Sequence, residues 1–242
     1  MMPAMAATRI EITTDDGVCP TFLFGDAAAP SVLMYMDGIG MRPALHAIAE
    51  RLASMGFHVM LPDLFYRIGP YTAPEPARLF NDPAVRMEWF TRLSATTTSA
   101  NIMRDTRAFL AQLPGAKVGT TGYCMGGRLS LIAAGTYPER IAAAAAYHPG
   151  NLANDAPDSP HLLAAKIKAR VYVAAASEDP SFPDEQVQRL RQAFVAAGVD
   201  HVIETYPAKH GWVPSDTPVH DPASADRHYE TLAALLRGAL AA

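Results

Sequence analysis

The chain has 242 residues, of which half are hydrophobic, and its formal net charge at pH 7 is −4. A chain of this length can bury one sizeable core, and the charge balance, without any run of lysine or arginine, argues against nucleic-acid and anionic-membrane surfaces. We therefore expect a protein whose partner is a small molecule.

The N-terminal segment MMPAMAATRIEI has neither the basic region nor the continuous apolar stretch of a signal peptide, and no later run is long enough to cross a bilayer. The two cysteines, Cys19 and Cys124, are too few for a disulfide framework. We expect a cytoplasmic protein in which both remain thiols, with Cys19 in the core.

Short apolar or β-branched runs alternate with longer helical patterns, which is typical of a mostly parallel sheet covered on both faces. The predicted strands are Ile10–Thr14, Val18–Phe24, Ser31–Asp37, His58–Pro62, Lys117–Thr121, Ile141–Tyr147, Arg170–Ala176 and His201–Tyr206. The predicted helices are Pro43–Met55, Ser99–Leu113, Gly127–Thr136, Asp184–Ala197 and Ala223–Leu240. The turn Asp15–Gly17 joins the first two strands in an antiparallel hairpin. The sequence thus predicts a single α/β domain over residues 1–242, with a sheet of about eight strands.

Two segments have ambiguous patterns. The run IAAAAAY at Ile141–Tyr147 is rich in alanine, which favours helix, but Pro138 interrupts the preceding helix and a central strand between close helices tolerates small side chains. We therefore predict a strand there. The segment Leu64–Pro83 is rich in proline and aromatic residues, and we interpret it as an active-site loop or lid, with a purely structural excursion as the alternative.

The segment GYCMG places Cys124 in a tight turn between a predicted strand and a predicted helix. Gly122 and Gly126 leave room where the two backbones pass close together, as in a nucleophile elbow. The helix N-terminus also favours the thiolate, which is the nucleophilic form of cysteine. On this pattern alone, a small core cysteine in a glycine-rich turn is an equal alternative.

Two later loops supply an acid and a histidine, in the chain order typical of this kind of turn. Asp179 follows the strand Arg170–Ala176, and His210 follows the last predicted strand. Glu178 is the alternative acid, and a surface histidine is the alternative interpretation of His210. Together with Cys124, these residues predict a Cys–His–Asp triad.

The remaining histidines do not indicate a metal site, because no pair has the His-x-x-x-His spacing of a zinc site. We therefore predict no metal. His148, in the segment YHPG, lies at the expected carboxyl edge of its strand. It can line a pocket there or make a structural hydrogen bond.

Several of these segments together resemble the dienelactone hydrolase family of α/β-hydrolases. The resemblance runs from about Ser31 to the C-terminus and rests on MDGIGMRPALHAIAERLASMGFHVMLPDLFYRIGP, GTTGYCMGGR, SEDPSFP and KHGW. It implies an α/β-hydrolase fold and a triad of Cys124, His210 and Asp179 that cleaves lactones or other esters without a cofactor. It also implies that Asp37, one methylene shorter than the glutamate usual there, contacts the resting thiol; shaping the turn is its alternative role.

The mechanism expected from this arrangement begins with attack of the thiolate on an ester carbonyl and formation of a thioester. The N–H group of Met125 and one from the Gly38–Ile39 turn would hold the oxyanion. Water activated by His210 would then release the acid.

The resemblance leaves the substrate open. Members that cleave dienelactone bind its carboxylate with arginines, one of them shortly after the catalytic histidine, whereas here GWVPSD follows His210 and the next arginine is Arg227. The expected pocket residues are Phe65, Tyr66, Tyr71, Phe80, His148 and Trp212, with Arg67 and Arg78 as candidate cations. We therefore expect neutral, hydrophobic esters or lactones to be better substrates than dienelactone.

Two other classes of function compete with hydrolysis: thiol redox or transfer chemistry at Cys124, and a ligand-binding protein that has lost turnover. No second cysteine is placed by the sequence to resolve an oxidised Cys124, and an intact triad argues against lost turnover. The sequence does not decide between a monomer and a homodimer.

Overall fold

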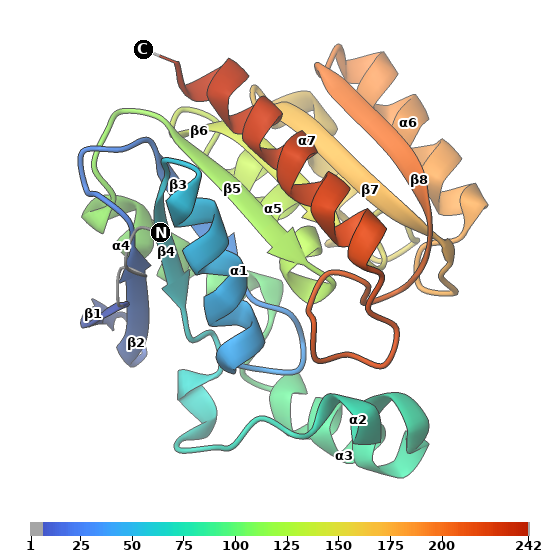
Figure 1. The fold of residues 1–242 in the computed structure, drawn as a ribbon. Helices are drawn as coiled ribbons and strands as arrows, with labels where there is room; N and C mark the ends of the chain where they lie inside the picture. Colours follow the sequence, from blue (N-terminus) through green and yellow to red (C-terminus); the bar gives the residue numbers. More distant parts are fainter. Residues whose placement is uncertain (1–6, 242) are drawn as a thin grey trace.

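An eight-stranded sheet runs through the molecule, and helices cover both of its faces (Figure 1). The computed structural model describes residues 7–241. The strands are β1 (Thr8–Thr14), β2 (Gly17–Phe24), β3 (Ser31–Tyr35), β4 (His58–Pro62), β5 (Val118–Tyr123), β6 (Ile141–Tyr147), β7 (Arg170–Glu178) and β8 (His201–Lys209). They pair in the order β1-β2-β4-β3-β5-β6-β7-β8, and all pairings are parallel except those of β2 with β1 and β4. The predicted mostly parallel sheet with an antiparallel hairpin at one edge is confirmed.

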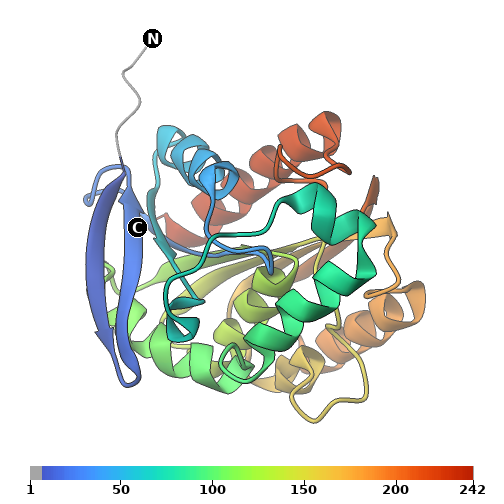
Figure 2. The same cartoon turned by 90° about the horizontal axis from the view of Figure 1, so that it is seen from below.

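The helices divide between the two faces of the sheet. They are α1 (Pro43–Ser54), α2 (Pro76–Asn81), α3 (Pro83–Ser94), α4 (Ser99–Gln112), α5 (Met125–Thr136), α6 (Asp184–Ala197) and α7 (Pro222–Leu240), with short 3-10 helices at Tyr66–Ile68 and Pro160–Lys166. Figure 2 shows α1 and α7 on one face and α4, α5 and α6 on the other. Because both faces are covered, β3, β4 and β5 are buried along their whole length. All five predicted helices are present.

The segment predicted as an irregular loop or lid, Leu64–Pro83, is partly helical, and a helix that the sequence analysis missed follows it. We call α2 and α3 together, residues 76–94, the α2–α3 hairpin; it stands apart from the sheet, near the carboxyl ends of β4 and β5 (Figure 1). Pro83 lies in the first turn of α3, and the Asp82 carboxylate accepts hydrogen bonds from the N–H groups of Ala84 at 2.9 Å and Val85 at 3.3 Å. Asp82 and Pro83 lie at the end of the segment that was expected to be irregular, but they start a helix.

The alanine-rich run Ile141–Tyr147 is a strand, as predicted. Its alanines from Ala143 to Ala146 are completely buried. Small side chains are needed in this part of the sheet because the covering helices come close: a Cβ added to Gly119 of β5 would lie 2.3 Å from a methyl carbon of Leu236 in α7. Tertiary packing therefore outweighs the helix propensity of alanine here.

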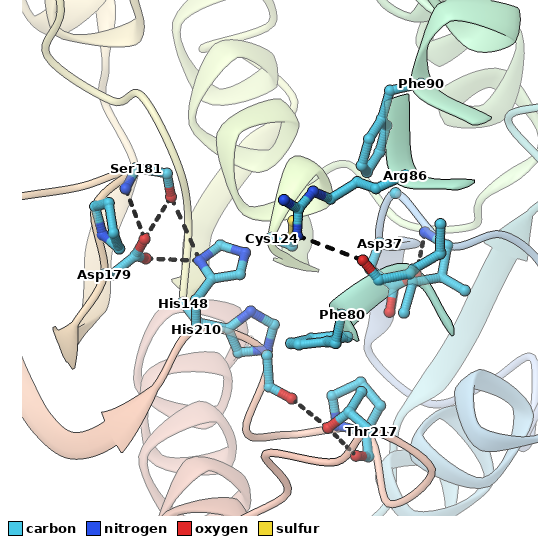
Figure 3. Close-up of a pocket in the computed structure, with 16 residues that line it drawn as sticks. Asp37, Phe80, Arg86, Phe90, Cys124, His148, Asp179, Ser181, His210 and Thr217 are labelled. Atoms are coloured by element: carbon cyan, nitrogen blue, oxygen red, sulfur yellow. Dashed lines mark hydrogen bonds and ion pairs between the residues drawn. The ribbon is translucent and has the colours of Figure 1, made fainter. Parts of the chain in front are cut away.

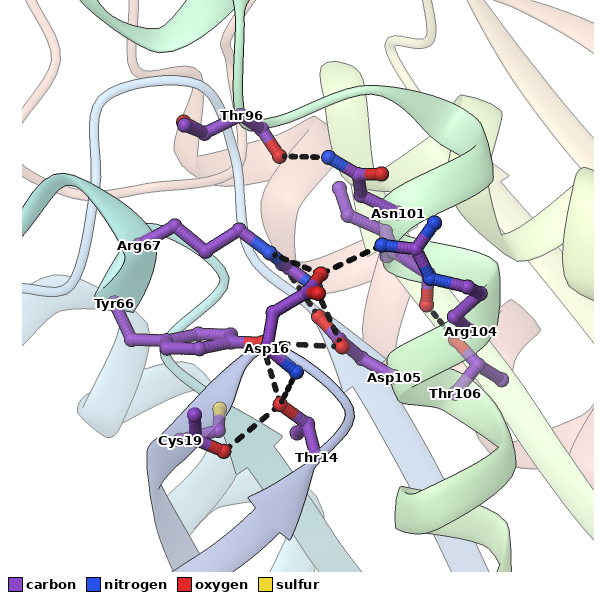
Figure 4. A network of polar contacts seen from close by, with 12 residues as sticks. Thr14, Asp16, Cys19, Tyr66, Arg67, Thr96, Asn101, Arg104, Asp105 and Thr106 are labelled. Atoms are coloured by element: carbon purple, nitrogen blue, oxygen red, sulfur yellow. Dashed lines mark hydrogen bonds and ion pairs between the residues drawn. The ribbon is translucent and has the colours of Figure 1, made fainter.

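A buried polar network ties the edge hairpin to the body of the molecule (Figure 4). Asp105 of α4 is completely buried and accepts hydrogen bonds from Arg67 at 2.7 Å and from the hydroxyl of Tyr66 at 3.1 Å. Arg67 also pairs with Asp16 in the turn between β1 and β2, at 2.8 Å. The Tyr66 hydroxyl lies 2.7 Å from the Thr14 hydroxyl. Arg67 thus connects its own 3-10 helix with α4 and with the turn between β1 and β2.

The described part of the chain has no helix that is both long and apolar enough to span a membrane. Residues 7–241 also contain no group of three or more His, Cys, Asp or Glu side chains placed to hold a metal ion.

Candidate active site

Cys124 lies directly after β5 in a sharp turn that leads into α5. Its backbone φ is +53°, a left-handed conformation that residues with a side chain rarely adopt. The flanking glycines permit the turn: a Cβ on Gly122 would lie 2.1 Å from the carbonyl oxygen of Gly126, and one on Gly126 would lie 2.3 Å from that of Tyr35. The strained turn and the close backbone approach are the geometry of a nucleophile elbow.

The structure brings Asp179 and His210 together at the same edge of the sheet as Cys124 (Figure 3). The strands β7 and β8 run slightly further than predicted, to Glu178 and Lys209, so that Asp179 and His210 each follow a strand directly, as Cys124 does. The Nδ1 atom of His210 lies 2.6 Å from Oδ2 of Asp179.

Ser181 completes the surroundings of the Asp179 carboxylate. Oδ1 of Asp179 accepts a hydrogen bond from the Ser181 N–H at 2.9 Å and one from its hydroxyl at 2.5 Å. Burial opposes the charge of Asp179, but the hydrogen bonds from His210 and Ser181 outweigh it and lower the pKa of this carboxyl group. Asp179 is therefore a carboxylate with both oxygens occupied.

His210 carries a positive charge near neutral pH. Burial disfavours its imidazolium form, but the negative charge of Cys124 and the hydrogen bond to Asp179 favour it and raise the pKa of His210 to about 10. His210 is therefore held as an imidazolium between Asp179 and Cys124. By contrast, burial raises the pKa of the Cys19 thiol to about 12, which keeps Cys19 neutral in the core.

His148 directly follows β6 and lies beside His210 and Trp212. It is 1% exposed, and its ring centroid lies 5.4 Å from that of His210 and 4.9 Å from that of Trp212. Burial, followed by the charge of His210, lowers the pKa of His148 well below its ordinary value. Neither ring nitrogen has a hydrogen-bond partner within residues 7–241. His148 is thus a neutral imidazole that lines the pocket.

The Asp37 carboxylate is held by hydrogen bonds within the turn after β3 and from Arg42. It is paired with the buried Arg42, with distances of 2.8 Å from Nη1 to Oδ1 and 2.9 Å from Nη2 to Oδ2. Oδ1 also accepts a hydrogen bond from the N–H of Ile39 at 2.9 Å. No hydrogen bond joins Asp37 to Cys124 among the described residues, although both line the same pocket, and the bonds that Asp37 makes fit the alternative role of shaping the turn before Gly38.

Two backbone N–H groups, one in the pocket that holds Cys124 and one in the residue after it, have no acceptor in the described part of the chain. The Ile39 N–H is occupied by Asp37, whereas the N–H groups of Gly38 and Met125 make no hydrogen bond to any atom of residues 7–241. Gly38 lines the pocket, and Met125 is the first residue of α5. These two donors fit the oxyanion site expected from the sequence, with Gly38 rather than Ile39 as the member from the turn.

The pocket over Cys124 encloses about 420 Å³. The α2–α3 hairpin forms one wall with the side chains of Leu79, Phe80 and Phe90, and Arg86 of α3 also lines it. Arg86 is exposed and has no acidic partner within residues 7–241; its one hydrogen bond is a long contact of 3.5 Å to the carbonyl oxygen of Leu79. This wall of the pocket is therefore apolar apart from Arg86, whose side chain is exposed at the rim.

Only part of the expected pocket is correct. Phe80 and His148 line the pocket, whereas Phe65, Tyr66, Arg67, Tyr71, Arg78 and Trp212 do not. Tyr66 and Arg67 belong to the Asp105 network, and Arg78 is exposed on α2. Phe65 and Tyr71 pack with Trp89, and Trp212 stacks on Tyr206. The periodicity of α2 turns Leu79 and Phe80 inward and leaves Arg78 outside.

Four residues around the pocket were not predicted from the sequence: Arg86, Phe90, Ser181 and Arg42. The start signal Asp82–Pro83 would have revealed α3, and the spacing of four residues between Arg86 and Phe90 then places both on one helix face. Ser181 stands two residues after Asp179, the spacing at which an aspartate accepts a hydrogen bond from the backbone in a turn. No comparable local pattern indicates Arg42, because its partner Asp216 is far away in the chain.

Comparisons with known proteins agree with this geometry. The model of the dienelactone hydrolase family matches residues 20–240. A carboxymethylenebutenolidase of Rhodococcus opacus is 26% identical over 204 residues, covering 82% of this chain and 76% of that protein. A provisionally named carboxymethylenebutenolidase of Methylorubrum extorquens is 27% identical over 216 residues, covering 84% and 70%. The structure of a provisionally named dienelactone hydrolase of Klebsiella pneumoniae has a TM-score of 0.82 at 22% identity, covering 96% of this chain and 98% of that chain, and has the same α/β-hydrolase fold.

Proposed function

This chain belongs to the dienelactone hydrolase family, a family of hydrolases, and from that premise we propose that it cleaves lactones or other carboxylic esters with Cys124 as the nucleophile. The observation that carries the proposal is the position of three side chains at one sheet edge. Cys124 stands in the elbow, and His210 lies 2.6 Å from Asp179 in the same pocket. A nucleophile, a base and a group that orients the base are the parts that acyl transfer requires.

In the first half of the proposed reaction, the Cys124 thiolate attacks the carbonyl carbon of the substrate. The carbonyl electron pair moves onto oxygen, and the N–H groups of Gly38 and Met125 stabilise the resulting oxyanion, each such donor contributing about 3 kcal/mol when preorganised. The intermediate then collapses to a thioester and expels the alkoxide, which takes the proton from His210. Asp179, bonded to Nδ1, leaves the other ring nitrogen of His210 for this transfer.

In the second half, water attacks the thioester. His210 is now neutral and removes a proton from the water, while Asp179 stabilises the imidazolium that forms. Collapse of the second tetrahedral intermediate releases the acid and returns the thiolate, and no cofactor is required. A thiolate expels an alkoxide or enolate more readily than an amide nitrogen, so lactones and activated esters are the proposed substrates.

The pocket supports an apolar substrate that is free to carry a negative charge at its outer end. Leu79, Phe80 and Phe90 favour apolar groups, and burying a carboxylate among them without a partner would be unfavourable. Arg86 stands at the rim, where a carboxylate can pair with it while staying in contact with water. Arg86 therefore takes the place that the sequence analysis gave to Arg67 or Arg78.

The test of the proposed function is the dependence of hydrolysis on Cys124. With p-nitrophenyl acetate we expect wild-type protein to release p-nitrophenol and Cys124→Ala to release it at the rate of a buffer control. Mass spectrometry of acid-quenched wild type should find an acetyl group on the peptide that contains Cys124. The matched control is Cys19→Ala, because Cys19 is a neutral thiol buried in β2 and should be dispensable for turnover. Equal turnover in wild type and Cys124→Ala would contradict the proposal.

A further inference from the structure

The turn formed by Asp37, Gly38 and Ile39 is held on two sides. The carbonyl oxygen of Gly38 accepts a hydrogen bond of 2.9 Å from Nε1 of Trp89, a buried side chain of α3. On the other side of the same peptide group, the N–H of Ile39 donates to Oδ1 of Asp37 at 2.9 Å. The Gly38–Ile39 peptide therefore has both of its polar atoms fixed by buried partners, and turning it would break two hydrogen bonds.

The Asp37 carboxylate is fixed in turn by an ion-pair bridge. Arg42 contacts both oxygens of Asp37, and its Nε and Nη2 atoms contact Asp216 at 2.7 and 3.2 Å. Asp216 belongs to the segment that follows His210. The bridge therefore connects the turn after β3 with the loop that carries the histidine, and a buried bidentate pair of this kind has little freedom to reorient.

The α2–α3 hairpin packs against the turn at Gly38, a residue whose backbone is flexible. A Cβ added to Gly38 would lie 2.9 Å from the ring of Phe90 in α3, so a larger residue at this position would have to displace that ring. Glycine is also the residue with the widest range of backbone conformations. The backbone conformation of Gly38 alone therefore does not fix the direction of its unpaired N–H. Contacts with neighbouring groups have to fix that direction.

We infer that Trp89 is a positioning residue for the reaction: it fixes the peptide that follows the Cα of Gly38, while the Arg42 bridge holds Asp37 before it, and the two supports together restrict rotation at Gly38 and keep its N–H directed at the oxyanion. This inference rests on the proposed function, because it assigns a role in stabilising an oxyanion. It also gives α3 a second role. The helix lines the pocket, and through Trp89 it also holds the turn after β3.

The test removes the Nε1–H of Trp89 and little else. We expect Trp89→Phe to lower kcat for p-nitrophenyl acetate by about tenfold, part of the loss seen when an oxyanion donor is deleted outright, with KM within about twofold. Alkylation of Cys124 by iodoacetamide forms no oxyanion, so its rate should stay within about twofold of wild type. Asp216→Asn, which weakens the bridge from a partly exposed position, should show the same pattern with a smaller loss.

The matched control is Tyr137→Phe, which also removes a hydrogen bond from an aromatic side chain to a backbone carbonyl, here from Tyr137 to Met103 outside the pocket. It should keep kcat. If Trp89→Phe and Asp216→Asn also keep kcat within about twofold, in an enzyme that Cys124→Ala inactivates, the inference is wrong and the proposed function stands. A parallel loss of iodoacetamide reactivity would likewise overturn it. If wild type and Cys124→Ala turn over equally, the proposed function has failed and the role of Trp89 fails with it.

Discussion

Asp179 and Glu178 are neighbours in the chain, but their carboxylates lie in different surroundings. The Asp179 side chain is 1% exposed and bonded to His210, whereas the Glu178 side chain is 69% exposed and faces Lys209 at 3.7 Å. We predict that Asp179→Asn lowers kcat by about 10³-fold or more, because the amide neither stabilises the imidazolium nor keeps His210 in the required orientation. Glu178→Gln should stay within about twofold. Steady-state kinetics on one ester decide the matter, and an equal loss in both variants would exclude Asp179 as the acid.

The charge of Cys124 should raise the pKa of His210. Cys124→Ala removes a negative charge that favours the imidazolium, while burial continues to disfavour it. The protonated form should then be lost at lower pH, so the pKa of His210 should fall from about 10 toward the ordinary value of 6.5. Histidine ring resonances followed by ¹⁵N NMR from pH 5 to 11 report this directly. An unchanged midpoint would mean that Asp179 alone sets the charge of His210.

Arg86 should act on charged substrates only. We predict that Arg86→Gln lowers kcat/KM for mono-p-nitrophenyl succinate by about three- to fivefold, the range expected for an exposed ion pair, and leaves p-nitrophenyl butyrate unchanged. Arg78→Gln is the competing variant, since Arg78 lies outside the pocket on the neighbouring helix. A selective loss for the succinate ester in Arg78→Gln instead would place the cation where the sequence analysis had it.

At the scale of elements, the first turn of α3 links helix stability to substrate binding. Asp82→Ala removes the hydrogen bonds to Ala84 and Val85 and should destabilise this turn by about 1 kcal/mol. Because Arg86 and Phe90 follow on the same helix, we predict that KM for an apolar ester rises about three- to fivefold.

The control for this prediction is Asp221→Ala at the start of α7, where the Asp221 carboxylate accepts a hydrogen bond of 2.7 Å from the Ser224 N–H. It should lose a similar amount of stability in thermal unfolding but keep KM, because α7 does not line the pocket. If Asp82→Ala also keeps KM, the wall of the pocket does not depend on the cap of α3.

The elements also show which features a sequence can predict. Periodic hydrophobic patterns predicted the strands and five of the helices, and chain order predicted that Cys124, Asp179 and His210 would lie at one edge of the sheet, because each of these signals is local or follows from strand direction. The helix α3 lacked such a signal: only Trp89 and Leu93 are buried along it. Arg42 illustrates a second limit, since its bridge to Asp216 joins residues that only the folded chain brings together.

At the scale of the whole molecule, the Asp105 network should contribute strongly to stability. Arg67→Met leaves the carboxylate of Asp105, which is completely buried, without its cationic partner, and we predict a loss of about 3–5 kcal/mol in the free energy of unfolding. The matched variant Arg104→Met breaks a more exposed ion pair to Asp16 and should lose about 0–1 kcal/mol. Urea unfolding compares the two, and similar losses would mean that the network is a surface feature.

The left-handed backbone at Cys124 determines which residue type is most stable at this position. Glycine adopts that conformation without strain, so a chain selected for stability alone would gain about 1 kcal/mol by carrying glycine at position 124. A cysteine that served only to fill a core would be a poor choice, because the same volume fits elsewhere without strain. A thiol at a position where the backbone favours glycine therefore supports the proposed nucleophile over a residue that only fills the core.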